Sequence, residues 1–410
     1  MNSREERGVI IAALCKLTGN GGEWVVPSQT GPDKRYVVNP TAGTCTCPDH
    51  QETGFKCKHV WAVEFTMKRE CTADGTVTET RTMVFAEKKT YKQNWPAYNE
   101  AQVTEKHRFQ KLLHDLCAGI PQPPRTGKKG RPARLLSDTA FASVFKVYST
   151  VSTRRFSCDL ADAHAKGYTT KPIHYNSVCA YLEDEELAPV LKSLIVQSSL
   201  PLKAVETDFA VDSTGFTTSR FYRWYDHKYG VQREEHDWVK VHIATGVKTN
   251  VVTAAAIYGR DAADCPVLPE LVKGTAENFT VKEVSADKAY LSVENVEAIF
   301  AVGGTPFIAP KSNTTGGAGG LFQKMVHYYL YQQGEFMAHY HKRSNVESTN
   351  SMVKRKFGDH IRSRTDVAMR NEVYAKLLCH NLCCVILSQI ELGIEPVFWK
   401  EEKAAGALAV

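Results

Sequence analysis

The chain has 410 residues, of which 43% are hydrophobic and 10% aromatic, and it carries a formal net charge of +6 at pH 7. This length allows two or three domains, and the apolar content is high enough for packed cores, which excludes a mainly disordered protein. The small positive excess hints at a polyanionic partner.

The cysteines and apolar runs indicate the compartment. Twelve cysteines are too few for a disulfide scaffold in a chain of this length, so buried or metal-bound thiols in a reducing cytoplasm are expected. The short apolar run at 9–14 lacks a cleavage site of small residues, and we interpret it as an amphipathic helix rather than a signal peptide. The most apolar longer stretch, Leu377–Ile394, contains several polar residues, so no membrane association is expected.

Residues 1–75 contain a set of metal ligands that follows a short helix and two predicted strands, 23–27 and 35–39. The set consists of Cys45, Cys47, Cys57 and His59. Three thiolates and one imidazole suit a closed tetrahedral Zn²⁺ site, and free cysteines near a loop histidine are the alternative. The order Cys-x-Cys then Cys-x-His, in the contexts Cys-Pro-Asp and Cys-Lys-His, resembles a SWIM-type zinc finger. Such modules are associated with DNA or protein binding, and the sequence does not choose between them.

Residues 76–136 are predicted to connect this module to the rest of the chain. Helical periodicity extends over 101–118, and a segment rich in proline and glycine follows at 121–134, with five basic and no acidic residues. This composition is typical of an extended cationic linker. Its Gly-Arg131-Pro core resembles a minor-groove AT-hook, in which Arg131 would enter a narrow groove of DNA. An exposed linker that touches phosphates without reading bases is the simpler interpretation.

Residues 137–200 are predicted to be α-helical. Apolar residues recur at helical spacing over 137–148 and over 174–200. Helices of this kind can form a DNA-binding helix-turn-helix or a simple packing layer, and both interpretations stay open.

Residues 201–399 alternate between predicted strands and helices. The order is a strand ending at Asp212, strands 217–224, 239–245 and 249–257, helix 263–271, a strand ending at Asp287, helix 293–300, strand 306–310 and helix 340–357. Antiparallel strands followed by alternating strand and helix units give a mixed α/β sheet. Residues 400–410 are predicted to form a tail.

Three carboxylates in this region are predicted to meet. Asp212 and Asp287 each end an apolar run, and Glu347 lies on the following helix. Ligand sites gather where the strands of an α/β sheet end, and three oxygen ligands suit Mg²⁺ or Mn²⁺. Asp208 and Glu206 share a strand face with Asp212 and are its rivals; Asp212 is preferred because it would sit at an open strand end.

The helix that carries Glu347 has a distinctive polar face. Tyr340, Arg343, Glu347 and Lys354 are separated by three, four and seven residues, which places them on one side of a helix. A solvated charged face is the alternative interpretation. Basic residues continue beyond Lys354 with Arg355 and Lys356, and DNA backbone is expected to lie along this stretch.

Together these motifs resemble the Asp-Asp-Glu triad and the Y-R-E-K signature of bacterial insertion-sequence transposases that have a ribonuclease H-like core. The resemblance implies that Asp212, Asp287 and Glu347 hold two Mg²⁺ or Mn²⁺ ions. It also implies that Tyr340, Arg343 and Lys354 contact transposon-end DNA. Only 60 residues separate Asp287 from Glu347, which leaves no room for the large β insertion of some relatives.

The resemblance further implies a cytoplasmic, nucleoid-associated prokaryotic enzyme that cleaves transposon ends, joins them to target DNA, and assembles as a homodimer on DNA. Two alternatives remain open from the residues. One is a ribonuclease H-like nuclease that cuts without joining. The other is a domesticated zinc-finger DNA-binding protein without activity.

Overall fold

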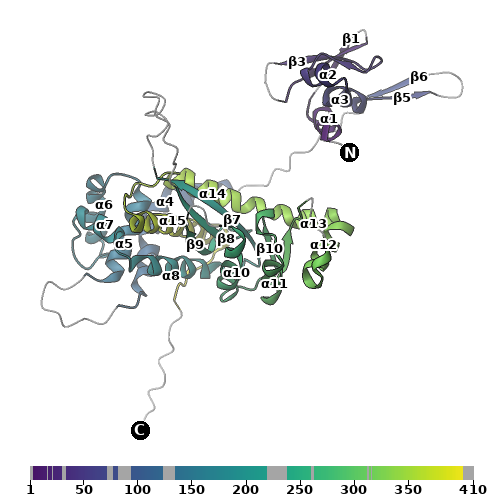
Figure 1. Cartoon of the computed structure of the whole chain (residues 1–410). Coiled ribbons are helices and arrows are strands. Elements are labelled where there is room, and N and C mark those ends of the chain that lie inside the picture. The colour runs from purple at the N-terminus through teal and green to yellow at the C-terminus, as the bar shows by residue number, and fades with distance from the viewer. Residues whose placement is uncertain are drawn as a thin grey trace. The chain divides into compact units, whose positions relative to one another are not determined.

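The computed structural model describes residues 3–399 except 16, 21, 30–33, 72–76, 82–93, 123–133, 219–237, 260–262, 312–313 and 315. It contains two compact units, Met1–Lys92 and Gln93–Val410, each with its own hydrophobic core (Figure 1). Arg131, most of the predicted strand 217–224 and the tail 400–410 lie outside the described residues.

The N-terminal unit is a small sheet with three helices. Its elements are α1 (Ser3–Leu14), β1 (Thr18–Asn20), β2 (Glu23–Pro27), β3 (Arg35–Asn39), β4 (Thr44–Cys45), α2 (Pro48–Thr53), α3 (Lys58–Thr66), and the hairpin of β5 (Met67–Cys71) and β6 (Val77–Arg81). Strands β1 to β4 form an antiparallel sheet in chain order, and the two predicted strands are confirmed as β2 and β3. The core is thin: its largest buried side chain is Trp24, packed with Ile11, Val26, Val38 and Val60.

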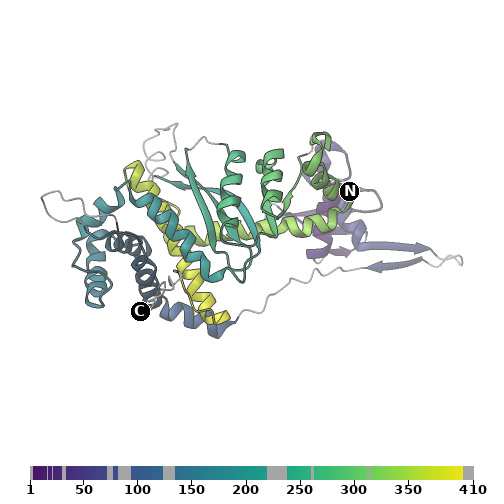
Figure 2. The same cartoon turned by 90° about the horizontal axis from the view of Figure 1, so that it is seen from below.

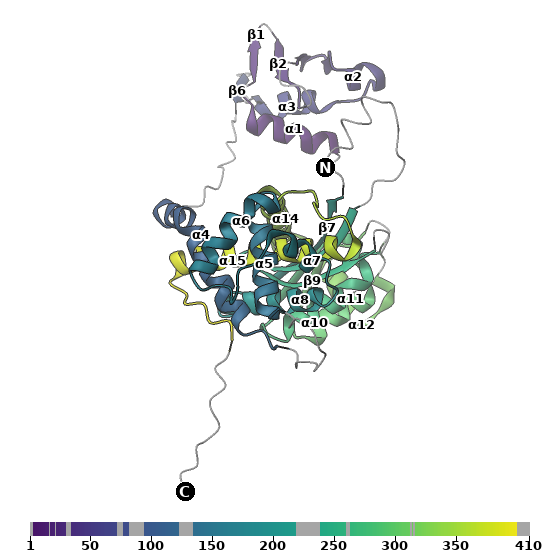
Figure 3. The same cartoon turned by 90° about the vertical axis from the view of Figure 1, so that its left-hand side faces the viewer.

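The described residues between 94 and 202 are mainly helical. The elements are α4 (Trp95–Ala118), α5 (Leu136–Ser149), α6 (Thr153–Ala165), α7 (Tyr175–Leu182), α8 (Leu187–Ser199) and a 3-10 turn, η1 (Leu200–Leu202). The sequence interpretation missed α6 and merged α7 with α8. The long C-terminal helix α15 (Asp366–Leu392) packs against α8 (Figure 2) and also against α4, α5 and α7 (Figure 3). This helical region therefore shares one core with the C-terminal part of the chain.

A five-stranded mixed sheet forms the centre of the second unit. Its strands are β7 (Asp208–Thr217), β8 (Trp238–Gly246), β9 (Val252–Tyr258), β10 (Glu283–Ala286) and β11 (Thr305–Ile308), in the order β11-β10-β7-β8-β9. Strands β7, β8 and β9 are antiparallel, whereas β10 and β11 run parallel to β7. The predicted mixed α/β, ribonuclease H-like sheet is confirmed.

Alternate residues of the sheet face different layers, as the two-residue period of a strand requires. Ala210 and Ile243 face a core built with α8, α14 (Ser344–Phe357) and α15, whereas Phe209 and Ala244 face α10 (Leu268–Ala276) and α11 (Val293–Ala301). Asp212 follows Ala210 by two positions and therefore belongs to the face covered by α14.

One prediction about β7 is wrong. The strand was expected to end at Asp212, but it continues to Thr217, and Asp212 pairs with Ile243 in the middle of the β7–β8 ladder. The physical reason is that β8 is long enough to pair with Ser213-Thr214-Gly215, so the polar residues extend the ladder instead of turning away from it.

The remaining elements lie between and after the strands. They are the 3-10 turns η2 (Cys265–Val267), η3 (Lys288–Tyr290) and η4 (Gly316–Ala318), and the helices α12 (Gly320–Tyr331) and α13 (Gln333–Tyr340), with η5 (His341–Arg343) before α14. The predicted helix 340–357 is thus interrupted by a 3-10 turn that places Tyr340 at the end of α13 and Glu347 in the first turn of α14.

Helix α15 is the central helix of the second unit. Among the described helices it is the one long and apolar enough to cross a membrane by length and composition, and 78% of its most apolar stretch is buried inside the fold, as in a core helix. The side chain of Asn381 accepts a hydrogen bond from the amide of Val252 and donates to its carbonyl, which fixes α15 to the edge of β9.

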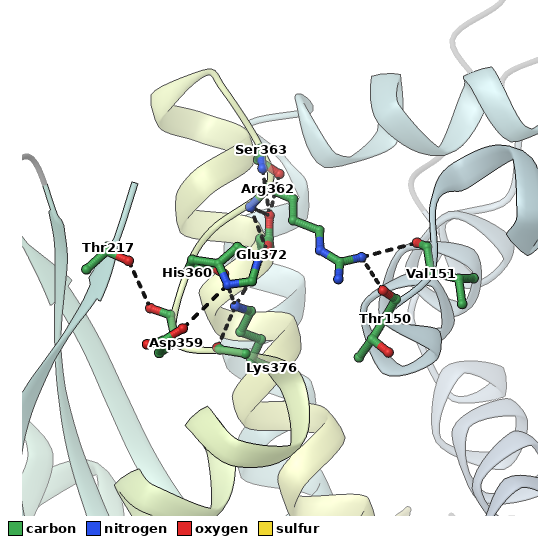
Figure 4. A network of polar contacts seen from close by, with 10 residues as sticks. Thr150, Val151, Thr217, Asp359, His360, Arg362, Ser363, Glu372 and Lys376 are labelled. Carbon is green, nitrogen blue, oxygen red and sulfur yellow. Dashed lines mark hydrogen bonds and ion pairs between the residues drawn. The ribbon is translucent and has the colours of Figure 1, made fainter. Parts of the chain in front are cut away.

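A buried carboxylate holds the segment between α14 and α15. Glu372 accepts hydrogen bonds from the amides of Arg362 and Ser363, and from the Ser363 hydroxyl at 2.8 Å. Its neighbour Lys376 donates to the carbonyls of Gly358 and His360 (Figure 4). Both side chains are almost fully buried and lie 3.6 Å apart.

We expect Glu372→Ala to reduce the free energy of unfolding by about 3–5 kcal/mol, because it leaves the amides of Arg362 and Ser363 without their acceptor and the buried Lys376 ammonium without its carboxylate partner. Urea unfolding followed by circular dichroism measures this loss. Glu391→Ala, an exposed change near the end of the same helix, is the control and should leave stability close to that of the wild type. Equal unfolding midpoints for the two variants would contradict this account.

Candidate active site

Parallel pairing of β7 with β10 brings two of the predicted carboxylates together. Val211 pairs with Ala286, so Asp212 and Asp287 follow at adjacent positions of neighbouring strands. Asp287 is the first residue after β10, where the chain leaves the sheet for η3. Helix α14 packs across β7 and β8 and carries Glu347 in its first turn, toward the same place.

Arg343 joins two of the three acids. Its guanidinium lies 2.7 Å from Oε1 of Glu347 and 3.8 Å from Oδ1 of Asp287. The electrostatics of Asp212 show that it shares this environment. Burial raises the pKa of Asp212, and the charges of Asp287 and Glu347 raise it further, while the amide of Ser213 and the charge of Arg343 oppose the shift. The three predicted carboxylates therefore converge around one arginine.

A depression of about 620 Å³ opens beside these groups. It is lined by Asp212, Ser213, Thr214, Glu347, Asn350, Ser351, Lys354, Arg355 and Asp359. Burial lowers the pKa of Lys354, an effect that Asp359 and Asp212 oppose, so this ammonium lies within electrostatic reach of the carboxylates. Arg355 is exposed at the rim. Acidic groups beside cations in one open depression suit a phosphate-containing substrate whose reacting group requires metal ions.

The other residues of the predicted DNA-binding set lie in different surroundings. Tyr340, the last residue of α13, is 9% exposed and packs in the core. Its ring centre is 6.0 Å from the guanidinium carbon of Arg343. Lys356 forms an ion pair with Glu105 of α4 and lies 3.3 Å from Sγ of Cys383. Its charge is therefore engaged within the protein, away from the depression.

The two rivals of Asp212 have other partners. Asp208 is the first residue of β7, and its carboxylate is 2.7 Å from Nζ of Lys342; the same ammonium is 2.7 Å from Glu283. Glu206 is fully buried and accepts hydrogen bonds from the amides of Lys248 and Thr249 in the turn between β8 and β9. Both carboxylates hold structural contacts, so neither competes for the position beside Asp287.

A buried polar cluster next to Asp212 was underestimated from the sequence. His242 is fully buried, pairs with Ser213 across the β7–β8 ladder, and lies 3.0 Å from the hydroxyl of Tyr290. Lys240 lies 2.6 Å from Asp264. The alternation of the sequence suggests a partly exposed strand at Lys240-Val241-His242, but His242 is buried because the η2–α10 region and η3 cover this part of β8. In the sequence, Tyr290 of Asp287-Lys-Ala-Tyr290 was the residue that could have indicated a polar partner for His242.

The four cysteine and histidine ligands of the N-terminal unit also converge. One ligand atom from each of Cys45, Cys47, Cys57 and His59 lies within 4.8 Å of the others, and all four residues are buried. Nδ1 of His59 is 3.8 Å from Sγ of both Cys45 and Cys57. Tetrahedral zinc with ordinary bond lengths separates such ligand atoms by roughly 3.5–3.8 Å, so these residues fit Zn²⁺.

Secondary structure explains why these ligands meet. Cys47 is the N-cap of α2 and Cys57 the N-cap of α3, while Cys45 ends β4. Gly54 adopts a left-handed φ of 67° at the end of α2, which reverses the chain between the two ligand pairs. The spacing of the motif thus places two helix N-termini against one strand end.

Two family models match this chain. Residues 203–382 match a transposase DDE domain, and residues 35–68 match a SWIM zinc finger. The first match spans all five strands of the sheet together with Asp212, Asp287 and Glu347, and the second contains the four zinc ligands. A search of curated proteins found no match. The chain therefore carries a transposase DDE domain and an N-terminal SWIM zinc finger with a Cys₃His cluster.

Proposed function

We propose that this chain is a DNA transposase that cleaves the phosphodiester at transposon ends and transfers the freed 3′ hydroxyl into target DNA. The observation that carries the proposal is the convergence of Asp212, Asp287 and Glu347 around Arg343, within a region that matches a transposase DDE domain. Transposition requires phosphoryl transfer on DNA, and clustered carboxylates are the protein ligands of metal-assisted phosphoryl transfer.

The carboxylates fit Mg²⁺ or Mn²⁺. None of the described residues forms an ion pair with Asp212, and its carboxyl is partly buried beside two other acids. Three acids beside Arg343 and Lys354 keep a net negative charge, and hard oxygen ligands are those that these cations prefer. In our proposal Asp212, Asp287 and Glu347 hold the ions, which would activate the attacking oxygen and stabilise the leaving one.

The surrounding cations bind and orient the DNA. Lys354 and Arg355 line the depression beside Asp212 and Glu347, where they would contact backbone phosphates. Arg343 holds Asp287 and Glu347 in place and can also reach a phosphate with the fork geometry of its guanidinium. Tyr340 packs beside Arg343 from the core, so we assign it the role of orienting this arginine.

The partner and compartment follow from this activity. DNA is the substrate, both as transposon end and as target. We expect a homodimer that assembles on two ends and works at the nucleoid in the cytoplasm, because paired cleavage of two ends requires two active sites. The zinc finger is available for DNA or for protein contacts.

The test is a plasmid assay. The DNA that flanks the coding frame is first inspected for inverted terminal repeats, and the repeats are cloned into a supercoiled donor. Purified protein with Mg²⁺ should nick the donor at the repeat ends and then join those ends to a target plasmid. Nicking without joined product would identify a nuclease instead. No nicking of any repeat-containing donor, with intact DNA binding, would favour the inactive DNA-binding alternative.

A further inference from the structure

A second cavity, of about 390 Å³, lies between the helical region and the segment that follows α14. Its walls come from α5, the start of α6, α7, the residues 362–364 and α15. All these elements belong to the second unit. The cavity is separate from the depression at Asp212, but the two sites are lined by successive parts of one stretch, 347–359 for the depression and 357–364 for the cavity.

One buried lysine in this cavity has no partner. Lys146 of α5 is 8% exposed, and none of the described residues offers its ammonium an ion pair or a hydrogen bond. Lys146 itself lines the cavity, together with Arg362, Glu372 and Cys179. Burial and the charge of Arg362 lower the pKa of Lys146, and Glu372 opposes this shift without forming an ion pair. Because a buried charge without an ion pair is costly, a ligand anion in the cavity would stabilise it.

The other charged groups at the cavity leave it positive. Besides Lys146, it is lined by three cations, Arg362, Arg364 and Lys376, and by two acids, Glu372 and the exposed Glu183. The acceptor oxygens of Glu372 are already occupied by the amides of Arg362 and Ser363 and by the Ser363 hydroxyl. Glu183 also lines the cavity from its exposed edge, and neither it nor Glu372 forms an ion pair with Lys146 among the described residues.

The start of α6 adds donors to the same wall. Ser152 is the N-cap of this 13-residue helix, and Ser152 and Thr153 both line the cavity. The cap uses the amide of Arg155, so the amides of Thr153 and Arg154 in the first turn have no intrahelical acceptor. Arg362 donates to the carbonyls of Thr150 and Val151, which holds the turn before α6 against the segment after α14 (Figure 4). A helix N-terminus fixed beside a buried lysine is a suitable anion site.

We propose that this cavity is a phosphate-binding subsite that takes a backbone phosphate of the DNA strand held at the Asp212 depression. The inference rests on the proposed function for its ligand. Apolar side chains of Val147, Val151 and Phe357 line the rest of the cavity and suit the attached sugar. From Glu347 to Phe357, α14 rises by roughly 15 Å, which is the length of about four base pairs of duplex lying along this helix.

The first test uses the salt dependence of binding to a repeat-containing duplex, measured by fluorescence anisotropy. Each phosphate contact contributes about 0.9 to the slope of log affinity against log salt. Lys146→Met should lower that slope by about 0.9, so that the affinity lost between about 50 and 200 mM salt becomes about 3.5-fold smaller. Lys146→Arg should keep the wild-type slope. Lys192→Met, an exposed lysine on α8, is the matched control and should also keep it.

The second test locates the phosphate. Single methylphosphonate substitutions, which remove one negative charge, are placed along each strand of the duplex. In the wild type a substitution about four base pairs from the scissile bond should weaken binding, and in Lys146→Met the same substitution should have no further effect. Arg364→Gln, an exposed change at the cavity edge, should weaken the effect at that position without altering the melting temperature.

The outcomes separate this proposal from the proposed function. Wild-type protein that binds the duplex but never nicks it would refute the proposed function and leave both binding tests valid. A wild-type salt slope and methylphosphonate profile in correctly folded Lys146→Met would refute the subsite. A third result would also refute the subsite. In it, inorganic phosphate or a free nucleotide raises the melting temperature of the wild type but not of Lys146→Met, and the two proteins bind DNA equally. The cavity would then bind a free anion and not the DNA backbone.

Discussion

Replacing Glu347 with Gln is expected to reduce magnesium-dependent nicking by about 10²–10³-fold or more, because the charge that develops during phosphoryl transfer loses part of its stabilisation. The change keeps the shape of the side chain and removes its charge. Since the carboxylate side chain is 53% exposed, the fold does not depend on it. Affinity for end-containing DNA should be unchanged or slightly stronger, because one negative charge is lost beside the cationic groups.

The measurement pairs a nicking time course with an anisotropy titration on the same duplex, in the absence of Mg²⁺ for the titration. Glu391→Gln, an exposed glutamate at the end of α15, is the control and should nick at the wild-type rate. Wild-type nicking by Glu347→Gln would remove α14 from the active site. Equal loss of nicking and of DNA binding would instead assign Glu347 to substrate binding.

Removal of zinc is expected to unfold the N-terminal unit and leave the second unit folded. The core around Trp24 is thin, and structural zinc sites contribute about 10–16 kcal/mol of apparent binding free energy to folding at neutral pH. A chelator should therefore expose residues 1–67 to limited proteolysis, while a fragment that contains the sheet and α15 persists. Elemental analysis before chelation should find about one zinc per chain.

The matched variants for this experiment exchange equal numbers of thiols. Cys45→Ser with Cys57→Ser should lose the zinc and the protease resistance of the N-terminal unit. Cys158→Ser with Cys179→Ser, two exposed cysteines of the helical region, should retain both properties. Equal zinc content in the two double variants would refute the ligand assignment.

Local motifs carried most of what the sequence could predict. Strands β2 and β3, the mixed sheet and the four zinc ligands follow from short patterns whose physical meaning does not depend on distant residues. That Asp212 and Asp287 lie next to each other could also be predicted, because both follow buried apolar runs and parallel strands place such positions side by side.

Contacts between distant residues explain what the sequence could not predict. Lys356 looked like a DNA contact within a basic stretch, but its partner Glu105 lies 251 positions away on α4. Arg362 holds the carbonyl of Thr150 across 212 positions. The extension of β7 beyond Asp212 depends on the length of β8, and no property of Ser213 or Thr214 alone reveals it.

The sequence also did not reveal where the helical region packs. Apolar spacing predicted helices there, but it could not show that α5 and α8 pack on α15, and α8 also on β9, in one core. The 3-10 turn at 341–343 also depends on contacts with residues far away in the sequence. Lys342 reaches Asp208 and Glu283 at one end of the strands, while the neighbouring Arg343 reaches Asp287 at the other, and these opposed contacts accompany the break in the helix.

The measurement that tests the central claim most directly compares Asp212→Asn with Asp208→Asn in magnesium-dependent nicking. The two changes are chemically identical and lie on one strand, but only Asp212 shares the environment of Asp287, Glu347 and Arg343, whereas Asp208 pairs with Lys342. We predict that Asp212→Asn binds end DNA and does not nick it, and that Asp208→Asn nicks at close to the wild-type rate. Nicking by Asp212→Asn at the wild-type rate, with Asp208→Asn inactive, would contradict the proposed active site.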